Sequence, residues 1–270
     1  MYCDWESLLK ILPAWLREDV NRLGAESLQE LRLRLNAPPQ LILNQGRQAI
    51  RGKVTQEDLT FCINAASRYS PWATATVQEG YLTTAGGHRI GICGEVSGSG
   101  FRQIRSLCIR VARDYPGIGE KASLLSGSVL VLGAPGWGKT TLLRDLIRQR
   151  SLRENVAVVD ERGELFPYGF DTGIQTDVLT AVRKSQGILR LLKTMGPATI
   201  AVDEITSPED MTALLEAFGC GVNLLASAHG TCLQDLCSRP VYKTLLNNSV
   251  FTHVLILRKD QSYVTERMTV

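Results

Sequence analysis

The 270-residue sequence lacks several features that would place it in a common class of proteins. It holds no run of about 18 consecutive apolar residues, the length that a membrane-spanning helix needs. The opening residues, MYCDWESLLK, have neither the basic start nor the apolar stretch of a secretory signal. We therefore expect a cytoplasmic protein with no transmembrane segment of its own.

Signals for metal binding and nucleic-acid binding are also scarce. The seven cysteines include no Cys-x-x-Cys pair, so the usual zinc and redox motifs are excluded, and we expect free thiols that fill small apolar sites. The formal net charge is only +3, and 6% of the residues are aromatic, which is few for the stacking of bases. We therefore expect no nucleic-acid partner.

The composition is that of a folded protein, with 44% hydrophobic and 21% charged residues. A turn-rich segment, DYPGIG at 114–119, divides the chain into two parts with different patterns. We predict an N-terminal domain over 1–115 and a second domain over 116–270.

The first part predicts a small α+β domain. Leu31 and Leu33 alternate with Arg32 and Arg34, which is typical of a half-buried strand with a basic outer face. The sequence TQED at 55–58 resembles the capping box that opens a helix. That helix is expected over roughly 56–69, another helix is expected near 5–16, and further strands are expected near 81–96 and 101–113.

The second part predicts an α/β domain. Short apolar runs recur along it and are mostly separated by segments of helical length. Such runs are what parallel strands buried on both faces of a sheet require. The predicted strands lie at 128–133, 155–160, 198–203, 223–229 and 253–259.

A phosphate-binding loop stands between the first of these strands and a helical segment. Residues 133–140 read GAPGWGKT and fit the pattern G-x-x-x-x-G-K-[ST] at every fixed position. Glycines let the backbone curl around phosphate oxygens, and the first turn of the following helix offers N–H groups and a partial positive charge. We expect nucleotide contacts from Gly133, Ala134, Pro135, Gly136, Trp137, Gly138, Lys139, Thr140 and Thr141.

Three residues of this P-loop have distinct expected roles. Lys139 supplies a positive charge to the terminal phosphates of ATP, and the hydroxyl of Thr140 is a ligand for Mg²⁺. Trp137 is unusual in such a loop. It either packs over the loop or lies near the nucleotide base, and both readings stay open.

Two carboxylates follow the strand at 198–203. Open α/β sheets bind ligands at the carboxyl ends of their strands, so these side chains are expected beside the bound nucleotide. Asp203 is the candidate for the metal shell, acting through a water molecule. Glu204 is the candidate general base, or the residue that positions the attacking water.

Two further strand ends carry polar groups. Residues 160–164 read DERGE, and within them Glu161 and Glu164 are candidates to reach magnesium or its waters. Because this strand comes directly after the P-loop helix, we expect it to neighbour the P-loop strand. His229 interrupts the apolar run at 223–229 and is expected to sense the γ-phosphate and couple it to movement.

In order, these four segments resemble the boxes of the secretion and type IV pilus ATPases, and most closely those of the sporulation relatives of that group. The likeness covers most of the chain. It is carried by GKTTLLRDLIR at 138–148, VVDERGE at 158–164, VDEI at 202–205, ASAHG at 226–230, LQELRLRLNAPP at 28–39 and GGHRIGICGEV at 86–96. The acidic box reads Asp-Glu-Arg where pilus ATPases have Glu-Asp-Pro, so the division of roles within it stays open.

The resemblance implies a RecA-like P-loop ATPase domain with a smaller N-terminal α+β domain, hydrolysis of ATP with Mg²⁺, and a homo-oligomeric ring, usually of six subunits. It also implies a peripheral position at a membrane-embedded export or channel complex during sporulation. In that family, arginines before the ATPase domain reach the phosphates, and Arg105, Arg110 and Arg113 lie in the matching region. The expected catalytic residues are Lys139, Glu204, Glu161, Glu164, His229, Arg110 and Arg113, with Thr140 and Asp203 at the metal.

Two other functions are compatible with the same core. A nucleic-acid motor of the RecA or helicase type is favoured by the basic strand that contains Arg32 and Arg34, and its ATP turnover would rise with DNA or RNA. A scaffold that assembles on nucleotide would form ATP-dependent oligomers with negligible turnover.

Overall fold

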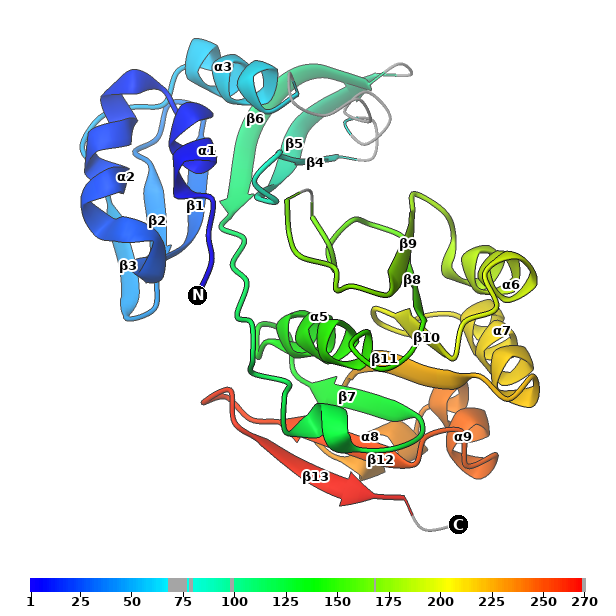
Figure 1. Ribbon diagram of the computed structural model, residues 1–270. Helices are drawn as coiled ribbons and strands as arrows, with labels where there is room; N and C mark the ends of the chain where they lie inside the picture. The colour runs from blue at the N-terminus through cyan, green and yellow to red at the C-terminus, as the bar shows by residue number, and fades with distance from the viewer. Residues whose placement is uncertain (68–76, 78–79, 98–99, 168, 269–270) are drawn as a thin grey trace. The chain divides into compact units, whose positions relative to one another are not determined.

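The computed structural model of the protein describes residues 1–67, 77, 80–97, 100–167 and 169–268. The chain divides into two compact units, each with its own sheet and its own core (Figure 1). Unit 1 consists of Met1–Asp114 and Pro167–Phe170. Unit 2 consists of Tyr115–Phe166 and Asp171–Val270. Within the described residues, none of the helices has the length and apolar character that a membrane span needs.

Unit 1 is an antiparallel sheet with helices packed on it. Its strand order is β3-β2-β1-β6-β5-β4, and every pair of neighbours is antiparallel. The elements are α1 (Trp5–Lys10), α2 (Ala14–Ser27), β1 (Leu28–Arg34), β2 (Gln40–Leu43), β3 (Gly46–Ala49), α3 (Gln56–Ser67), β4 (Tyr81–Thr83), β5 (Arg89–Ser97) and β6 (Gly100–Arg110).

The core of unit 1 follows the predicted pattern. Leu31 and Leu33 of β1 are buried against leucines of the helices, and Arg34 is exposed. The predicted capping box is confirmed, because the N–H of Asp58 donates to Oγ1 of Thr55 at 3.2 Å and the N–H of Thr55 donates to the Asp58 carboxylate at 2.9 Å. The predicted end of this helix at 69 lies outside the described residues.

His88 forms hydrogen bonds to backbone groups near both ends of the segment Met1–Asp114. Its side chain is fully buried, its Nε2 lies 2.8 Å from the carbonyl oxygen of Asp4, and its Nδ1 accepts from the N–H of Ala112 at 3.1 Å. Both bonds require the neutral ring with the proton on Nε2. Burial lowers the pKa of His88, while the backbone bond to Asp4 and the charge of that residue act in the opposite direction.

This burial predicts a pH dependence of stability. The unfolded chain takes up the His88 proton near its ordinary pKa of about 6.5, and the folded state takes it up only at lower pH. The stability from neutral His88 is therefore fully present above about pH 6.5, and it falls as the pH decreases, by up to about 1.4 kcal/mol per pH unit. Chemical denaturation of the wild type and of His88→Gln at pH 7.5 and 5.5 measures this. Between these two pH values, the free energy of unfolding of the variant should change less than that of the wild type. Equal changes would contradict the prediction.

The cysteines differ from the sequence-based expectation in one respect. All seven are free, as expected. Only Cys62 is buried, in the core of unit 1, where burial raises the pKa of its thiol to about 12. Cys93, Cys220 and Cys237 are exposed, so the expectation that the thiols fill apolar sites is wrong for them.

Unit 2 is a sheet with helices on both faces. Its strand order is β13-β12-β7-β11-β10-β8-β9, and all neighbours are parallel except β13 with β12. The elements are β7 (Val129–Gly133), α5 (Lys139–Arg150), β8 (Val156–Asp160), β9 (Thr176–Thr180), α6 (Lys184–Thr194), β10 (Thr199–Val202), α7 (Pro208–Gly219), β11 (Asn223–His229), α8 (Leu233–Cys237), α9 (Pro240–Asn247), β12 (His253–Leu257) and β13 (Tyr263–Arg267), with a short 3₁₀ turn at Ala122–Leu124.

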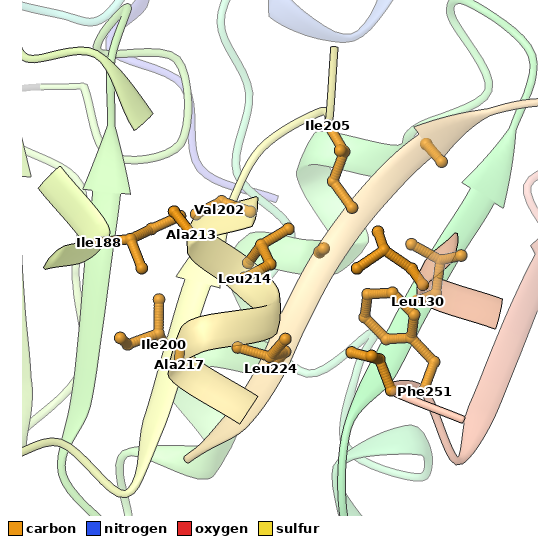
Figure 2. Close-up of a cluster of buried hydrophobic side chains, with 14 of the residues drawn as sticks. Leu130, Ile188, Ile200, Val202, Ile205, Ala213, Leu214, Ala217, Leu224 and Phe251 are labelled. Atoms are coloured by element: carbon orange, nitrogen blue, oxygen red, sulfur yellow. The ribbon is translucent and has the colours of Figure 1, made fainter. Parts of the chain in front are cut away.

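Each central strand of unit 2 is buried on both faces. On β7, Leu130 belongs to the cluster shared with α6 and α7, whereas Val131 belongs to the cluster shared with α5. Figure 2 shows the first cluster, in which Leu214 and Ile188 lie close to Ile200 of β10. This two-sided burial explains why the strands read as continuous apolar runs, and it confirms the predicted α/β class.

The order of the strands corrects one expectation. β8, which ends in Asp160, does not neighbour the P-loop strand β7, because β11 and β10 lie between them. Instead β8 pairs with β10, and Val159 is opposite Val202. The acidic segment therefore begins next to Asp203, and β11 brings His229 opposite Gly133 at the start of the P-loop.

Candidate active site

The P-loop joins β7 to α5, and its backbone requires glycine at two positions. Gly136 and Gly138 have φ angles of 79° and 94°, in the left-handed region that favours glycine. A Cβ atom added at either residue would meet no atom within 4 Å, so the space beside the loop is open. Gly138 is the N-cap of α5, and the positive end of that helix therefore begins at the loop.

Lys139 is the cation of this loop, and it is buried. The residue is 7% exposed, and its Nζ donates to the carbonyl oxygen of Ala134 at 3.2 Å and to Nδ1 of His229 at 2.9 Å. Burial lowers the pKa of Lys139, and the charges of Glu204 and Asp203 oppose that effect. A desolvated ammonium group beside an open, glycine-lined loop fits the phosphates of a nucleotide.

The bond from Lys139 fixes the state of His229. An ammonium group can only donate, so Nδ1 of His229 accepts, and the proton of the neutral ring lies on Nε2. This Nε2 lies 2.7 Å from Oε1 of Glu204 and donates to it. Lys139, His229 and Glu204, which come from α5, β11 and the end of β10, form one continuous chain of contacts.

Asp203 is fixed from three sides. Its Oδ2 accepts from the hydroxyl of Thr140 at 3.1 Å, and its Oδ1 accepts from the hydroxyl of Ser227 at 2.6 Å and from the N–H of Glu204 at 3.0 Å. A hydroxyl and a carboxylate side by side are the oxygen groups that Mg²⁺ prefers. Among the described residues, no three His, Cys, Asp or Glu side chains form a metal cluster, so phosphate oxygens and waters would complete such a site.

Glu204 stands in a strained part of the backbone. Its φ of 22° is unusual for a residue with a side chain, and such conformations cost on the order of 1–3 kcal/mol. The surroundings hold it in place, because the N–H of Glu204 donates to Oγ of Ser227 at 3.0 Å and the hydroxyl of Tyr242 donates to the carbonyl of Ile205 at 2.5 Å. Burial, with the charge of Glu204 adding to it, raises the pKa of Tyr242 to about 12, so this hydroxyl remains a donor.

Asp160 organises the acidic segment. It is 1% exposed, and its carboxylate accepts from the N–H groups of Glu164 and Phe166, each at 2.9 Å. Burial raises the pKa of Asp160 and the charge of Asp203 adds to this, whereas the bond from Phe166 lowers it. Arg144 of α5 donates to the carbonyls of Glu164 and Leu165 and holds the same segment from the other side.

The acidic segment and the end of β10 line one small hollow. Glu161 and Glu164 line it together with Asp203 and Glu204. Glu161 is also paired with Lys184 of α6, whose Nζ donates to it at 2.9 Å. The sheet thus brings all four predicted carboxylates to one edge.

The predicted arginines belong to unit 1 and have partners there. Arg110 is 65% exposed and lies 3.6 Å from the carboxylate of Glu30. Arg105 donates to Glu95 at 2.7 Å. The guanidinium of Arg113 donates to the carbonyls of Ala25 and Leu28, and so it fastens the junction of α2 and β1.

Several residues that sequence reasoning missed complete the site. Ser227 had a usable signal, because it is a polar residue inside an apolar strand and two positions before His229. Arg144, Lys184 and Tyr242 act through contacts between elements that are distant in the sequence. No local pattern distinguishes them from surface residues.

Comparisons with known proteins find similar sequences along most of the chain. A family model described as "Sporulation stage III, protein AA" matches residues 4–266. The curated protein named "Stage III sporulation protein AA" from Bacillus subtilis (strain 168) is 34% identical, over 93% of this chain and 90% of that protein. The predicted likeness to sporulation relatives is thereby confirmed.

Solved structures share the fold. The Legionella pneumophila ATPase DotB has a TM-score of 0.57 at 17% identity, covering 95% of this chain and 80% of that chain. The pilus retraction motor PilT, solved with bound ADP, has a TM-score of 0.64 at 16% identity, covering 92% and 80%. At these identities the likeness shows the fold alone, and that fold agrees with the predicted P-loop ATPase fold.

Proposed function

The chain belongs to the family described as sporulation stage III, protein AA, and from that premise we propose that it is a mechanoenzyme that hydrolyses ATP with Mg²⁺. The observation that carries this proposal is the chain of contacts from Lys139 through His229 to Glu204, beside the pair formed by Thr140 and Asp203. A cation, a metal-binding pair and a proton acceptor meet there at the carboxyl edge of one sheet.

In the proposed mechanism Lys139 exchanges its bond to His229 for bonds to phosphate oxygens. His229 would sense this exchange, because its Nδ1 loses the Lys139 donor while its Nε2–H still holds Glu204 in position. Glu204 orients a water molecule and accepts its proton. Thr140 and Asp203 would hold the magnesium ion, which when bound neutralises phosphate charge.

The remaining predicted residues take supporting roles in this proposal. Glu161 and Glu164 hold waters near the metal, which is supported by the hollow they share with Asp203. Of the two arginines, Arg110 is the better candidate to reach phosphates, because its side chain is exposed whereas the guanidinium of Arg113 is bonded to backbone carbonyls.

We further propose the setting that the family resemblance implies. The protein would form a homo-oligomeric ring, with six subunits as the expected number, at the cytoplasmic side of a membrane-embedded channel during sporulation. The 1–115 segment would be the smaller N-terminal domain, and its movement against the ATPase domain would do the work. The name of PilT, a pilus retraction motor, supports a motor function for this fold.

A phosphate-release assay with purified full-length protein tests this function. We expect turnover of ATP that requires Mg²⁺ and is unchanged by DNA or RNA. Stimulation by nucleic acid with a steep salt dependence would instead favour the helicase-type motor. Oligomers that form with ATP but release no phosphate would favour the assembly scaffold.

A further inference from the structure

Exposed apolar side chains gather at the amino ends of the parallel strands of unit 2, on the edge opposite the candidate active site. Among the described residues of unit 2, seven large apolar side chains are exposed, and five of them lie within five residues of the start of a strand. These strands are direct neighbours in the sheet, in the order β7-β11-β10-β8-β9. The residues that precede them, which we call the amino-edge set, are in the same order Leu124, Phe218, Met195, Leu152 and Ile174, with exposed fractions between 38% and 80%. One such residue is ordinary on a protein surface, but one before each of five neighbouring strands forms a patch.

The loops that carry the amino-edge set form one connected surface. Backbone hydrogen bonds from N–H to carbonyl oxygen join neighbouring loops, namely Ala198 to Asn155 at 3.0 Å, Asn223 to Ala198 at 3.0 Å and Val156 to Gln175 at 2.9 Å. The guanidinium of Arg153 donates to Oγ of Ser123 at 3.2 Å and joins the loop before β8 to the turn before β7. The starts of β8, β9, β10 and β11 are level, because the first residue of each is paired with the first residue of its neighbour.

The patch extends to both sides of the sheet. Leu152 follows α5, which packs on one face, whereas Met195 follows α6 and Phe218 lies in the last turn of α7, and these two helices pack on the other face. Neighbouring strands are about 4.8 Å apart, so five strands span about 19 Å along the edge. The amino-edge set is therefore a broad, level patch and not the narrow stripe that one helix of a partner would cover.

Positive charges stand among these apolar side chains. The basic residues that are exposed in the same loops and helix ends are Lys121, Arg153 and Lys193. Two acids at this edge are paired with arginines of α5, Asp171 with Arg148 at 3.3 Å and Glu154 with Arg150 at 3.5 Å. Glu120 and Glu216 are exposed as well, so the excess of positive charge is small. The patch thus combines apolar tips with cations between them.

This combination fits a lipid surface better than a protein partner. The core of a protein interface is depleted of charged residues and enriched in aromatic ones. The amino-edge set has one aromatic member, Phe218, and is interrupted by cations. At an anionic bilayer, apolar side chains enter the boundary between headgroups and acyl chains while the cations stay among the headgroups.

We propose that the amino edge of unit 2 docks peripherally on an anionic lipid surface. Leu124, Leu152 and Ile174, with exposed fractions of 72%, 60% and 80%, are the side chains that enter the bilayer furthest. The candidate active site lies at the carboxyl ends of the same strands, so it faces away from the bilayer and stays open to nucleotide in solution. The proposal goes beyond the proposed function, and docking needs no nucleotide.

Flotation of the full-length protein with lipid vesicles tests this surface. One set of vesicles contains phosphatidylcholine with about one third phosphatidylglycerol, and a second set contains phosphatidylcholine alone. The wild type should bind the first set about fivefold more strongly than the second. The combined variant Leu124→Ser, Leu152→Ser and Ile174→Ser should bind the first set about a hundredfold more weakly than the wild type, at about fivefold for each apolar side chain removed.

Matched variants separate docking from a general loss of apolar surface. The control for Ile174→Ser is Val96→Ser, because Val96 is 72% exposed on β5 of unit 1 and should not touch the bilayer. A second readout removes no apolar side chain. The emission of Ile174→Trp, taken as the difference from the wild type, should shift to shorter wavelength when phosphatidylglycerol vesicles are added, and that of Val96→Trp should not shift.

Several results would overturn the proposal. They are a wild type that floats with neither set of vesicles, equal binding to both sets, a combined variant that floats as the wild type does, or an emission of Ile174→Trp that vesicles leave unchanged. Sedimentation velocity without vesicles tests the alternative occupant. If the combined variant dissociates an oligomer that the wild type forms, the patch is a contact between copies of this chain and the lipid surface is wrong. ATP turnover is measured separately, so the proposed function can fail or hold independently of this result.

Discussion

Replacing Lys139 by methionine is expected to lower ATP hydrolysis on the order of a thousandfold while the folded protein stays nearly as stable as the wild type. In the proposed function the ammonium group is the positive charge that the P-loop offers to the phosphates, and such preorganised charge accounts for rate effects of this size. The same group is buried, which lowers its pKa. Methionine fills the space without that desolvation and loses only the bonds to Ala134 and His229. The free energy of unfolding should change by no more than about 1 kcal/mol.

Phosphate release and chemical denaturation on the same preparation measure both effects. Lys193→Met is the matched control, because Lys193 is exposed in the last turn of α6 and should change neither quantity. A Lys139→Met protein with wild-type turnover would remove Lys139 from the catalytic residues. A large loss of stability would show that the bonds of Lys139 to Ala134 and His229 hold the site together.

The strand ends that build the site could be predicted from the sequence. A run such as VLVLG or TIAV contains only residues that a sheet buried on both faces accepts, so the polar residue that follows it must leave the sheet at its edge. Parallel strands present their carboxyl ends on the same side. This is enough to bring Lys139, Asp203, Glu204 and His229 into one region before any contact is known.

The order of the strands could not be predicted in the same way. β8 follows the P-loop helix directly, but the connection passes over two strands and places β8 next to β10. The sequence VAVVD of β8 does not indicate which strand β8 will pair with, because the strands in the middle of this sheet are all similarly apolar. The placement depends on how the helices pack on the two faces.

The individual hydrogen bonds could not be predicted from the sequence either. Arg113 was a candidate for phosphate contact, yet its guanidinium satisfies carbonyls of Ala25 and Leu28, which are more than eighty positions away in the chain. The positive φ of Glu204 depends on Ser227, which comes from a different strand. These partners are distant in the sequence, and they come together only when the core is packed.

Replacing Glu204 by glutamine is expected to slow hydrolysis by about a hundredfold to a thousandfold while ATP still binds. The amide oxygen of glutamine can still accept from Nε2–H of His229, so the arrangement around Lys139 and His229 is kept. The amide cannot accept a proton from the attacking water at neutral pH. The change therefore removes the proposed proton acceptor and leaves the charge of Lys139 and the proposed metal-binding pair of Thr140 and Asp203 in place.

Single-turnover hydrolysis and equilibrium binding of ATP separate these two effects. Glu209→Gln is the matched control, because Glu209 is an exposed carboxylate in the first turn of α7, and its loss should leave both quantities unchanged. A Glu204→Gln protein that hydrolyses ATP at the wild-type rate would move the proton acceptor to Glu161 or Glu164, which line the same hollow. If the variant instead lost binding and turnover together, Glu204 would act through His229 to hold Lys139 in place and would not be the acceptor in the chemical step.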